Sequence, residues 1–421
     1  NSIAIIASIL ALLYGPFLLY ESALLRVTLI TFTTLLSLYL TIKAFSKKNS
    51  FLFLLTGTIV GIGFITKSTF VLYFISIFII LFFHSYLKKT AFFAPLLLLL
   101  GFLIPLLPVM IRNFTVNVPV TQISSVGAIT FINANTIDFP PGIGFHVARK
   151  ADYLMFKTKG ELIPAIYYTI KSYPNIFAYL YKILQKLSVF WTWQEIKNNL
   201  NYFYYKKYSF LLSHVCITFP LIGVTSLIGL LLLIKKFKQR LFLFLTIIIT
   251  LIPQVIFYNL SRFRIPTVAL LIPFAAYTIY FFITNIFSKK YEIVTILCFF
   301  VILLSLIMFY LIPSPLPILH DVEYEIGNTL CVRNIKDQIL LNKLQKASLI
   351  VDKSLNTAPE KIKNLFSDQN IRKEKINPYL IQSFAKMNYW GYLLNIKLAN
   401  KRKALFYKKQ HEDLQVMLQK E

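Results

Sequence analysis

The most constraining feature of this sequence is a set of long apolar runs without a charged residue. Four of them cover residues 90–111, 241–260, 265–288 and 293–319. An uncharged apolar run of about 18 or more residues is long enough to cross the hydrocarbon core of a bilayer as a helix. Only 14% of the residues are charged, and the mean hydropathy is +0.65. The sequence therefore predicts an all-α fold, a polytopic transmembrane helical bundle.

The apolar runs divide most of the chain into about nine predicted spans. These are residues 3–20, 27–42, 51–66, 70–87, 91–111, 214–234, 241–258, 267–285 and 293–311. The predicted organisation is a transmembrane bundle over residues 1–312, which includes a long external loop at residues 112–213. A polar, lysine-rich and helical external tail follows over residues 313–421.

Short clusters of basic residues between the spans set the predicted orientation. They are Lys43, Lys47 and Lys48; Lys88 and Lys89; Lys235, Lys236, Lys238 and Arg240; and Lys289 and Lys290. With nine spans, all four clusters lie on one side of the membrane, and the positive-inside rule makes that side cytoplasmic. The net charge of +27 then reflects topology and attraction to the lipid surface. The bilayer is a predicted partner, and nucleic acid is not.

The opposite, external side holds an unusual set of ionisable residues at the ends of the predicted spans. They are Glu21, Lys67, Arg112, Arg262 and Arg264. Taken singly, each has an ordinary explanation as a snorkelling side chain or as the end of a span. Together, one acid and four cations on a single face indicate a site for an anionic headgroup.

The long external loop contains one stretch with helical periodicity. Between Asn175 and Trp193 the apolar residues recur at helical spacing, whereas Lys182 and Lys186 lie four residues apart on the opposite face. We expect an amphipathic helix in the membrane interface, with Trp191 and Trp193 at headgroup depth. A helix packed on the bundle is the alternative interpretation, and the two are compatible.

Other chemical signals in the sequence are few. There is no glycine-rich phosphate loop, no zinc-ligand spacing and no Ser-His-Asp arrangement. Neither a nucleotide nor a divalent metal is implied. Three cysteines are too few for a disulfide framework.

Five stretches, in order along the chain, carry a resemblance to a known family. They are residues 13–29 (LYGPFLLYESALLRVTL), 55–70 (LTGTIVGIGFITKSTF), 112–135 (RNFTVNVPVTQISSVGAITFINAN), 186–212 with its Lys-Leu, Phe-Trp, Glu and Asn core, and 257–273 (FYNLSRFRIPTVALLIP). The chain resembles the bacterial relatives of protein O-mannosyltransferases and aminoarabinose transferases, which are glycosyltransferases of the GT-C fold. The likeness covers residues 1–311.

The resemblance implies a transferase that moves a sugar from a polyprenyl-phosphate donor to an acceptor hydroxyl. The acceptor would be a glycan, a lipid or a protein, at the external face of a bacterial cytoplasmic (inner) membrane. Glu21 would be the catalytic carboxylate of this chain. The donor phosphate would bind to Arg262, Arg264, Lys67 and Arg112.

Three further residues, Asn113, His146 and Glu195, are acceptor-site or loop candidates. A lone histidine is more often structural than catalytic. The chain departs from the family at Lys67-Ser68, where relatives usually have Arg-Pro. The main catalytic acid of the family also lies in a segment that we expect upstream of the first residue, as if this chain were truncated at its N-terminus.

A transporter or flippase for an anionic lipid or glycolipid is the competing class, because it would use the same external cations. Such proteins often have repeated halves and broken helices near the bilayer midplane. This sequence has no evident internal repeat, and its polar residues gather at one face.

Overall fold

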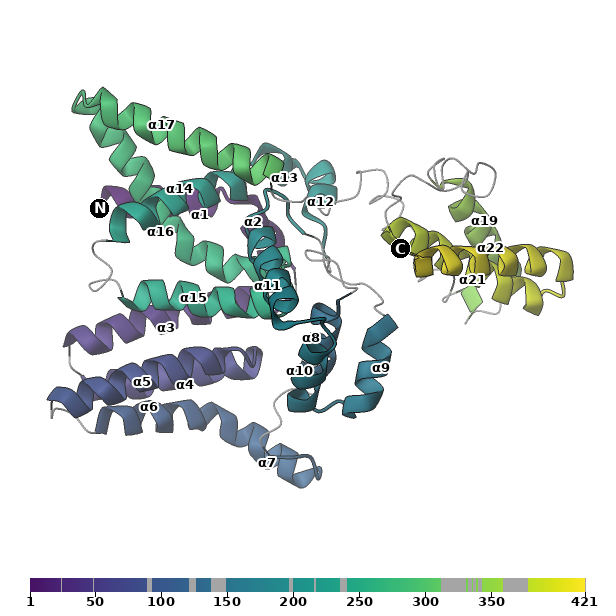
Figure 1. Cartoon of the computed structure of the whole chain (residues 1–421), viewed down its shortest axis with the longest axis horizontal. Coiled ribbons are helices and arrows are strands. Elements are labelled where there is room, and N and C mark those ends of the chain that lie inside the picture. The colour runs from purple at the N-terminus through teal and green to yellow at the C-terminus, as the bar shows by residue number, and fades with distance from the viewer. Residues whose placement is uncertain are drawn as a thin grey trace. The chain divides into compact units, whose positions relative to one another are not determined.

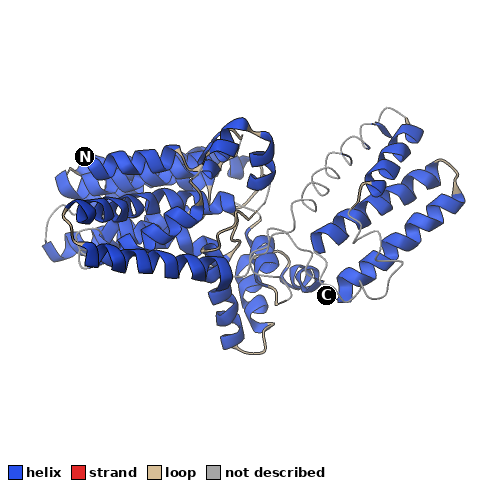
Figure 2. Ribbon diagram, turned by 90° about the horizontal axis from the view of Figure 1, so that it is seen from above, coloured by secondary structure: helices blue, strands red, loops and turns tan. Residues whose placement is uncertain are grey.

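The computed structural model describes residues 1–421 except 24, 48, 89–92, 121–125, 138–148, 197–199, 216, 235–240, 312–330, 332–334, 336–337, 340–342, 359–377 and 421. Within the described part, all regular secondary structure is helical, and the only β-type pairing is an isolated bridge between Tyr14 and Ile217. Figure 2 shows the helices and the loops that join them. The all-helical prediction is confirmed for these residues.

The chain divides into two compact units, unit 1 over Asn1–Pro315 and unit 2 over Leu316–Glu421. The helices of unit 1 are α1 (Ser2–Leu12), α2 (Gly15–Glu21), α3 (Val27–Lys47), α4 (Ser50–Thr66), α5 (Phe70–Lys88), α6 (Phe93–Leu103), the 3-10 turn η1 (Ile104–Leu106), α7 (Leu107–Thr115), α8 (Gly127–Asn135), α9 (Arg149–Thr158), α10 (Leu162–Lys171), α11 (Ile176–Phe190), α12 (Tyr202–Tyr208), α13 (Phe210–His214), α14 (Phe219–Leu233), α15 (Leu241–Ile256), α16 (Ser261–Phe287), α17 (Tyr291–Leu306) and the π-helical turn η3 (Ile307–Leu311).

Four stretches of helix in the described part are long and apolar enough to cross a membrane. They are Val27–Lys47, Phe93–Thr115, Ser261–Phe287 and Tyr291–Tyr310. Shorter apolar helices cover the other predicted spans: Ser2–Leu12, Phe51–Thr66, Phe70–Phe83, Phe219–Leu233 and Leu241–Ile256. The protein is therefore consistent with an integral membrane protein, and the full set of nine spans stays a prediction.

Prolines explain where the helices of the bundle break. Helix α2 begins at Gly15 after the extended residue Tyr14, with Pro16 in its first turn, so the single predicted span at residues 3–20 is two helices. Proline lacks a backbone N–H and cannot continue a preceding helix without losing a hydrogen bond. Pro105 and Pro108 likewise flank the junction at which α6 passes through η1 into α7.

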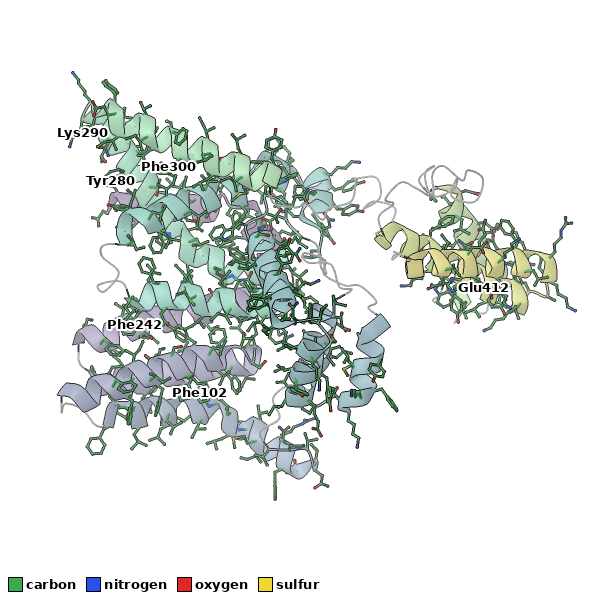
Figure 3. The ribbon with its side chains drawn as sticks, in the orientation of Figure 1. Phe102, Phe242, Tyr280, Lys290, Phe300 and Glu412 are labelled. Atoms are coloured by element: carbon green, nitrogen blue, oxygen red, sulfur yellow. The ribbon has the colours of Figure 1, made fainter. Side chains whose placement is uncertain are left out.

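The long helices of unit 1 run side by side, and their ends separate into two groups (Figure 1). The C-terminal end of α3, the junction of α16 with α17 and the start of α15 lie at the left end of the bundle. Lys290, in the short turn before α17, projects outward there (Figure 3). The other end, which we call the loop end, contains the C-terminal ends of α4 and α15 and the start of α16, together with α8–α13. This grouping places the basic clusters that the structure describes away from the candidate external residues.

Glycines allow two of these helices to approach closely. Gly57 of α4 faces the backbone of Leu98 in α6, and Gly101 of α6 faces the backbone of Leu54 in α4. A side chain at either position would collide with main-chain atoms. Small residues at helix contacts are the usual means of close packing between membrane helices, because association there depends on van der Waals contact.

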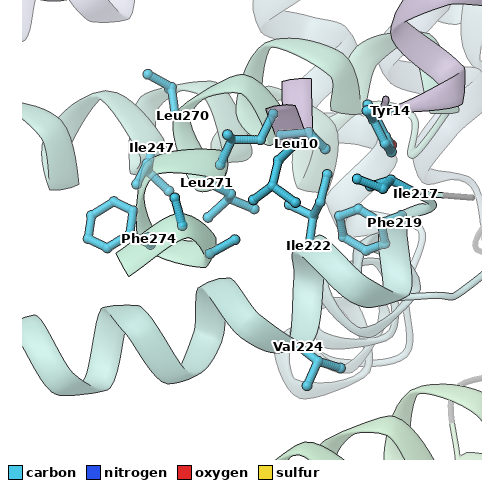
Figure 4. Close-up of a cluster of buried hydrophobic side chains, with 14 of the residues drawn as sticks. Leu10, Tyr14, Ile217, Phe219, Ile222, Val224, Ile247, Leu270, Leu271 and Phe274 are labelled. Carbon is cyan, nitrogen blue, oxygen red and sulfur yellow. The ribbon is translucent and has the colours of Figure 1, made fainter. Parts of the chain in front are cut away.

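The largest apolar core of unit 1 gathers around α16. Leu270, Leu271 and Phe274 of α16 are almost fully buried, and Phe219 and Ile222 of α14 pack in the same cluster (Figure 4). Helix α1 also packs on α16. The start of α16 is thus held by neighbours on several sides, which fixes the positions of the arginines in its first turn.

The helices at the loop end differ in direction from the bundle. Helix α11 runs across the ends of the long helices (Figure 1) and packs on the end of α15. Its apolar residues Ile176, Phe177, Leu180 and Leu184 are 48–75% exposed. The predicted amphipathic helix over residues 175–193 is confirmed as a helix, and a broad apolar face of it is uncovered within the protein.

Unit 2 has its own small core. Its described helices are α19 (Leu344–Asn356), α21 (Pro378–Lys397) and α22 (Lys401–Lys420), and α21 packs on both of the others. Ile335, Ala347, Val351, Met387 and Leu394 are buried together. The described part of the tail is helical, as the sequence predicted.

Candidate functional site

Three cations, Arg26, Lys67 and Arg262, lie close together at the loop end, and we call them the cationic rim. Arg26 Nη1 donates a hydrogen bond to the carbonyl oxygen of Thr66 over 3.1 Å, next to Lys67 in the chain. The Lys67 Nζ lies 4.7 Å from the centroid of the Phe263 ring, and the Arg262 guanidinium lies 4.6 Å from the same ring. Cation–π contacts of this kind orient a charge without neutralising it.

None of the rim cations forms an ion pair with a carboxylate in the part of the chain that the structure describes. Burial lowers the pKa of Lys67 from its ordinary value to about 8, and the positive charges of Arg262 and Arg26 contribute to the same shift. The Nε of Arg262 is buried and has no hydrogen-bond acceptor. Because like charges held together disfavour one another's charged forms, a bound anion would stabilise this group of cations.

An apolar pocket lies next to the rim, between α3, α5, α15 and α16. It has an empty volume of about 400 Å³, its opening included. Lys67 and Phe263 are part of its wall, so the pocket shares two residues with the rim's contacts. The other lining residues are Ile30, Thr34, Thr69, Phe70, Tyr73, Ile249, Thr250, Pro253 and Pro266. The pocket combines a largely apolar wall with a cation at its edge.

Arg264 has a different environment from Arg262, although they are two residues apart. Its guanidinium is buried and forms an ion pair with Glu195 at 2.8 Å. It also donates hydrogen bonds to the carbonyl oxygens of Phe190, Thr192 and Gln194 at 2.9–3.1 Å. The sequence grouped Arg264 with the donor-phosphate ligands, whereas its donors are used here to fix the loop after α11.

The helical start of α16 explains why the two arginines diverge. Residues 261–266 are helical, because α16 begins at Ser261. Residues two apart on a helix point in directions about 200° apart around the axis. Arg264 therefore enters the protein interior, whereas Arg262 lies against the ring of Phe263, which Lys67 also contacts. Pro266 adds to the local geometry because it cannot donate a hydrogen bond to the carbonyl of Arg262.

Glu195 belongs to a buried polar cluster and not to an open site. Tyr14 donates a hydrogen bond to Glu195 Oε1 over 3.2 Å, and Arg264 engages Oε2. Tyr202, also buried, lies against Gly15 and leaves no space there for a side chain. This cluster ties the α1–α2 break, the loop and α16 together, so Glu195 has a structural role in this arrangement.

Glu21 and Arg112 are exposed and lie apart from these contacts. Glu21 is the last residue of α2 and forms no ion pair within the described residues. Arg112 lies on α7, and its described side-chain contact is with Asn113 at 3.3 Å. Figure 1 shows α7 at a different edge of the bundle from the start of α16. The structure therefore does not bring Arg112 into the cationic rim.

The remaining candidates fall outside the rim. Asn113 is buried and donates hydrogen bonds to the carbonyls of Pro119 and Val120, which holds the chain after α7. His146 lies outside the described residues.

The two lysines of α11 lie opposite its exposed apolar residues, as expected, but that face is buried. Lys186 Nζ donates hydrogen bonds to Asn135 Oδ1 at 2.8 Å and to the carbonyls of Ile256 and Phe257 at 3.3 and 3.1 Å. Burial lowers its pKa to about 7. Lys186 thus fastens α11 to the last carbonyls of α15, a contact that counting apolar positions could not reveal.

Two residues of the site, Arg26 and Phe263, were not predicted from the sequence. Arg26 was not distinguished from an ordinary flanking cation, although it precedes an apolar run just as Lys67 does. Phe263 is the other, and its place between two arginines is a sequence signal for cation–π contact.

Comparison of the chain with known protein families, with curated proteins and with solved structures finds no match.

Proposed function

We propose that this protein is a membrane glycosyltransferase that uses a polyprenyl-phosphate sugar as its donor. One observation carries the proposal: three uncompensated cations lie together beside an apolar pocket between helices of a membrane bundle. A lipid phosphate has the matching chemistry, because its headgroup is anionic and its chain is hydrocarbon. The resemblance noted in the sequence adds the sugar and the GT-C architecture.

Arg262 and Lys67 are the proposed ligands of the donor phosphate. Arginine presents a planar fork of N–H donors to phosphate oxygens, and lysine adds a compact charge. Arg26 contributes further positive charge at the same place. The start of α16 also carries the partial positive charge of a helix N-terminus. Arg264 is not a proposed ligand, because its guanidinium is paired with Glu195. Arg112 is not a proposed ligand either, because its described side-chain contact is with Asn113 and not with the cationic rim.

The lipid chain of the donor would enter the adjoining pocket. Ile30, Phe70, Ile249 and Pro253 supply an apolar wall there, and burying hydrocarbon against such a wall contributes roughly 25 cal/mol per Å². Part of a long polyprenyl chain would remain in the bilayer. This placement keeps the phosphate at the loop end and the chain between the helices.

In the proposed reaction, an acceptor hydroxyl oxygen attacks the anomeric carbon of the sugar. The bond from that carbon to the phosphate oxygen breaks, and the lipid phosphate leaves with the electron pair. A carboxylate takes the proton of the hydroxyl. Arg262 and Lys67 stabilise the negative charge that develops on the leaving phosphate. Glu21, five positions before Arg26 in the chain, is the proposed carboxylate of this chain.

The topology belongs to the same proposal. Nine spans would place the loop end, with the cationic rim, on the external side of a bacterial cytoplasmic membrane. The basic clusters would then be cytoplasmic. The grouping of the described helix ends supports this arrangement.

A transfer assay in proteoliposomes separates a transferase from a lipid flippase. Purified protein would be supplied with a polyprenyl-phosphate sugar and a mixture of glycan, lipid and peptide acceptors. Loss of the sugar with formation of free polyprenyl phosphate, reduced at least tenfold in Glu21→Gln, is the expected result. Movement of the intact lipid between leaflets with no cleavage would instead identify a flippase.

A further inference from the structure

Helix α22 in unit 2 exposes apolar and basic side chains on one of its faces. Leu405 and Phe406 are 66% and 56% exposed. Four exposed cations flank this apolar pair along the helix. They are Lys401, Arg402, Lys408 and Lys409. We call these six residues the α22 basic face.

The opposite side of α22 is buried in the core of unit 2, which defines the direction of the basic face. Ala404, Tyr407 and Leu414 recur at helical spacing and are buried. Tyr407 packs against Gly391 of α21 and donates a hydrogen bond to Asp352 of α19. The exposed residues therefore project away from α19 and α21.

Neighbouring acids neutralise little of this charge. Lys403 Nζ pairs with Asp352 at 2.7 Å, so it belongs to the side that faces α19. Glu412 lies 3.8 Å from Lys408 Nζ as a helical i,i+4 pair on the surface. Asp413, the other acid of α22 in the described part, is half-buried. Lys401, Arg402 and Lys409 have no described carboxylate partner.

We propose that the α22 basic face binds the surface of a bilayer that contains anionic lipids. Large apolar side chains enter the boundary between headgroups and acyl chains, and flanking lysine and arginine residues attract anionic headgroups. Unit 2 follows directly in the chain after the last candidate span, which ends at Tyr310. The face is therefore held at high effective concentration near a membrane.

An acidic protein or a nucleic acid would use the cations equally well. A nucleic-acid base could stack on the exposed ring of Phe406, but Leu405 has no aromatic face for a second base. The combination of two insertable side chains and four cations on one helix face favours a lipid surface. This inference does not depend on the transferase proposal, because neither Leu405 nor Phe406 belongs to unit 1.

The test measures insertion at Phe406 in the full chain. Phe406→Cys, made in a variant whose three natural cysteines are serine, would carry an environment-sensitive NBD fluorophore. The protein would be placed singly in nanodiscs of phosphatidylcholine, with or without about one third phosphatidylglycerol. A blue shift of NBD emission with the anionic lipid, and a much smaller shift without it, is the expected result.

Two charge variants, each with four positive charges removed, test whether insertion depends on the cations of the α22 basic face or on the net charge of unit 2. Replacing Lys401, Arg402, Lys408 and Lys409 with glutamine should abolish the blue shift. Replacing four exposed lysines elsewhere in unit 2 with glutamine should preserve it; these are Lys343, Lys346, Lys353 and Lys386.

Two outcomes would overturn the inference. One is NBD emission that is the same in both lipid compositions, and the other is an equal loss of the shift in both charge variants. Binding of an acidic polymer to the face without a blue shift in anionic nanodiscs would also contradict it. If the cysteine-free protein does not fold, Phe406→Trp in the natural background gives the same test through quenching by brominated anionic lipids.

Discussion

Two arginines in the same helical turn have different environments in this protein. Arg264 is enclosed by Glu195, three carbonyl oxygens and the ring of Phe219 at 3.8 Å. Arg262 is half-buried, contacts a phenylalanine ring and faces other cations. Because both arginines lie in the first turn of α16, their spacing of two residues makes their side chains point in different directions. Which arginine would be enclosed depended on Glu195, about 70 residues away in the chain.

Arg264 is predicted to stabilise the folded protein. Arg264→Ala removes one partner of a buried ion pair and leaves the Glu195 carboxylate without its charge partner, at a cost of roughly 3–5 kcal/mol. The thermal unfolding midpoint in detergent should therefore fall by several degrees or more. Arg262→Ala, on the same turn, is the control and should change the midpoint little. Equal midpoints for the wild type and Arg264→Ala would contradict the assignment.

Lys67 gives the site a predicted pH dependence. Its pKa in the free protein is lowered to about 8 by burial and by the neighbouring Arg262 and Arg26. The ammonium form is therefore complete below that pH and is lost as the pH rises through it. Affinity for polyprenyl phosphate should weaken between about pH 7 and 9. The same titration in Lys67→Arg, which stays charged, should be flat over that range, and a flat wild-type curve would count against the role of Lys67.

At the scale of elements, the apolar runs predicted the positions of the helices more accurately than the residues at which those helices begin and end. The predicted span at residues 267–285 begins at Ser261 in the structure, because charged residues at the start of a helix do not stop it. The predicted span at residues 3–20 breaks between Leu12 and Gly15, because Pro16 starts a new helix and Tyr14 pairs with Ile217 instead. That pairing is a tertiary contact and has no local signal.

The close contact between α4 and α6 can be tested with a glycine substitution. Gly101→Leu would place a side chain against the backbone of Leu54, and the two helices would have to separate. Overpacking of this kind costs about 1–3 kcal/mol or more, so the unfolding midpoint should fall. Gly127→Ala is the control, because a Cβ at Gly127 meets only the Leu162 side chain at 3.8 Å. A similar midpoint for both variants would exclude the close packing described here.

Helix α11 is predicted to lie in the membrane interface. Phe177, 75% exposed, is on the uncovered apolar face, and Lys186 fixes the other face to α15. The tryptophan introduced by Phe177→Trp should be quenched by lipids brominated near the headgroup, since such a helix is buried to a depth of about 5–10 Å. Leu349→Trp in unit 2 provides an exposed comparison site. Equal accessibility of the tryptophan in the Phe177→Trp variant to lipid and to aqueous quenchers would show that the face does not contact lipid.

At the scale of the whole molecule, composition and hydropathy were sufficient for the helical class and for the presence of helices long and apolar enough to cross a membrane. They were less informative about the candidate site. The cations at span ends were visible, but Arg112 and Lys67 have the same local signal and different contacts: Arg112 with Asn113, and Lys67 with the ring of Phe263. Which cations lie close together depends on which helices are neighbours. That is decided by packing between α3, α4, α15 and α16, and a single sequence does not specify it.

The central claim is that Arg262 and Lys67 bind a lipid phosphate. Equilibrium binding of polyprenyl phosphate to the purified protein in detergent tests it most directly. The wild type would be compared with the double variant Lys67→Ala, Arg262→Ala and with Arg112→Ala as the matched surface control. Each charge-assisted contact is worth on the order of 1.5–3 kcal/mol, so the double variant should lose at least about a hundredfold in affinity. Arg112→Ala should bind like the wild type. Unchanged affinity in a correctly folded double variant, or an equal loss in Arg112→Ala, would contradict the account.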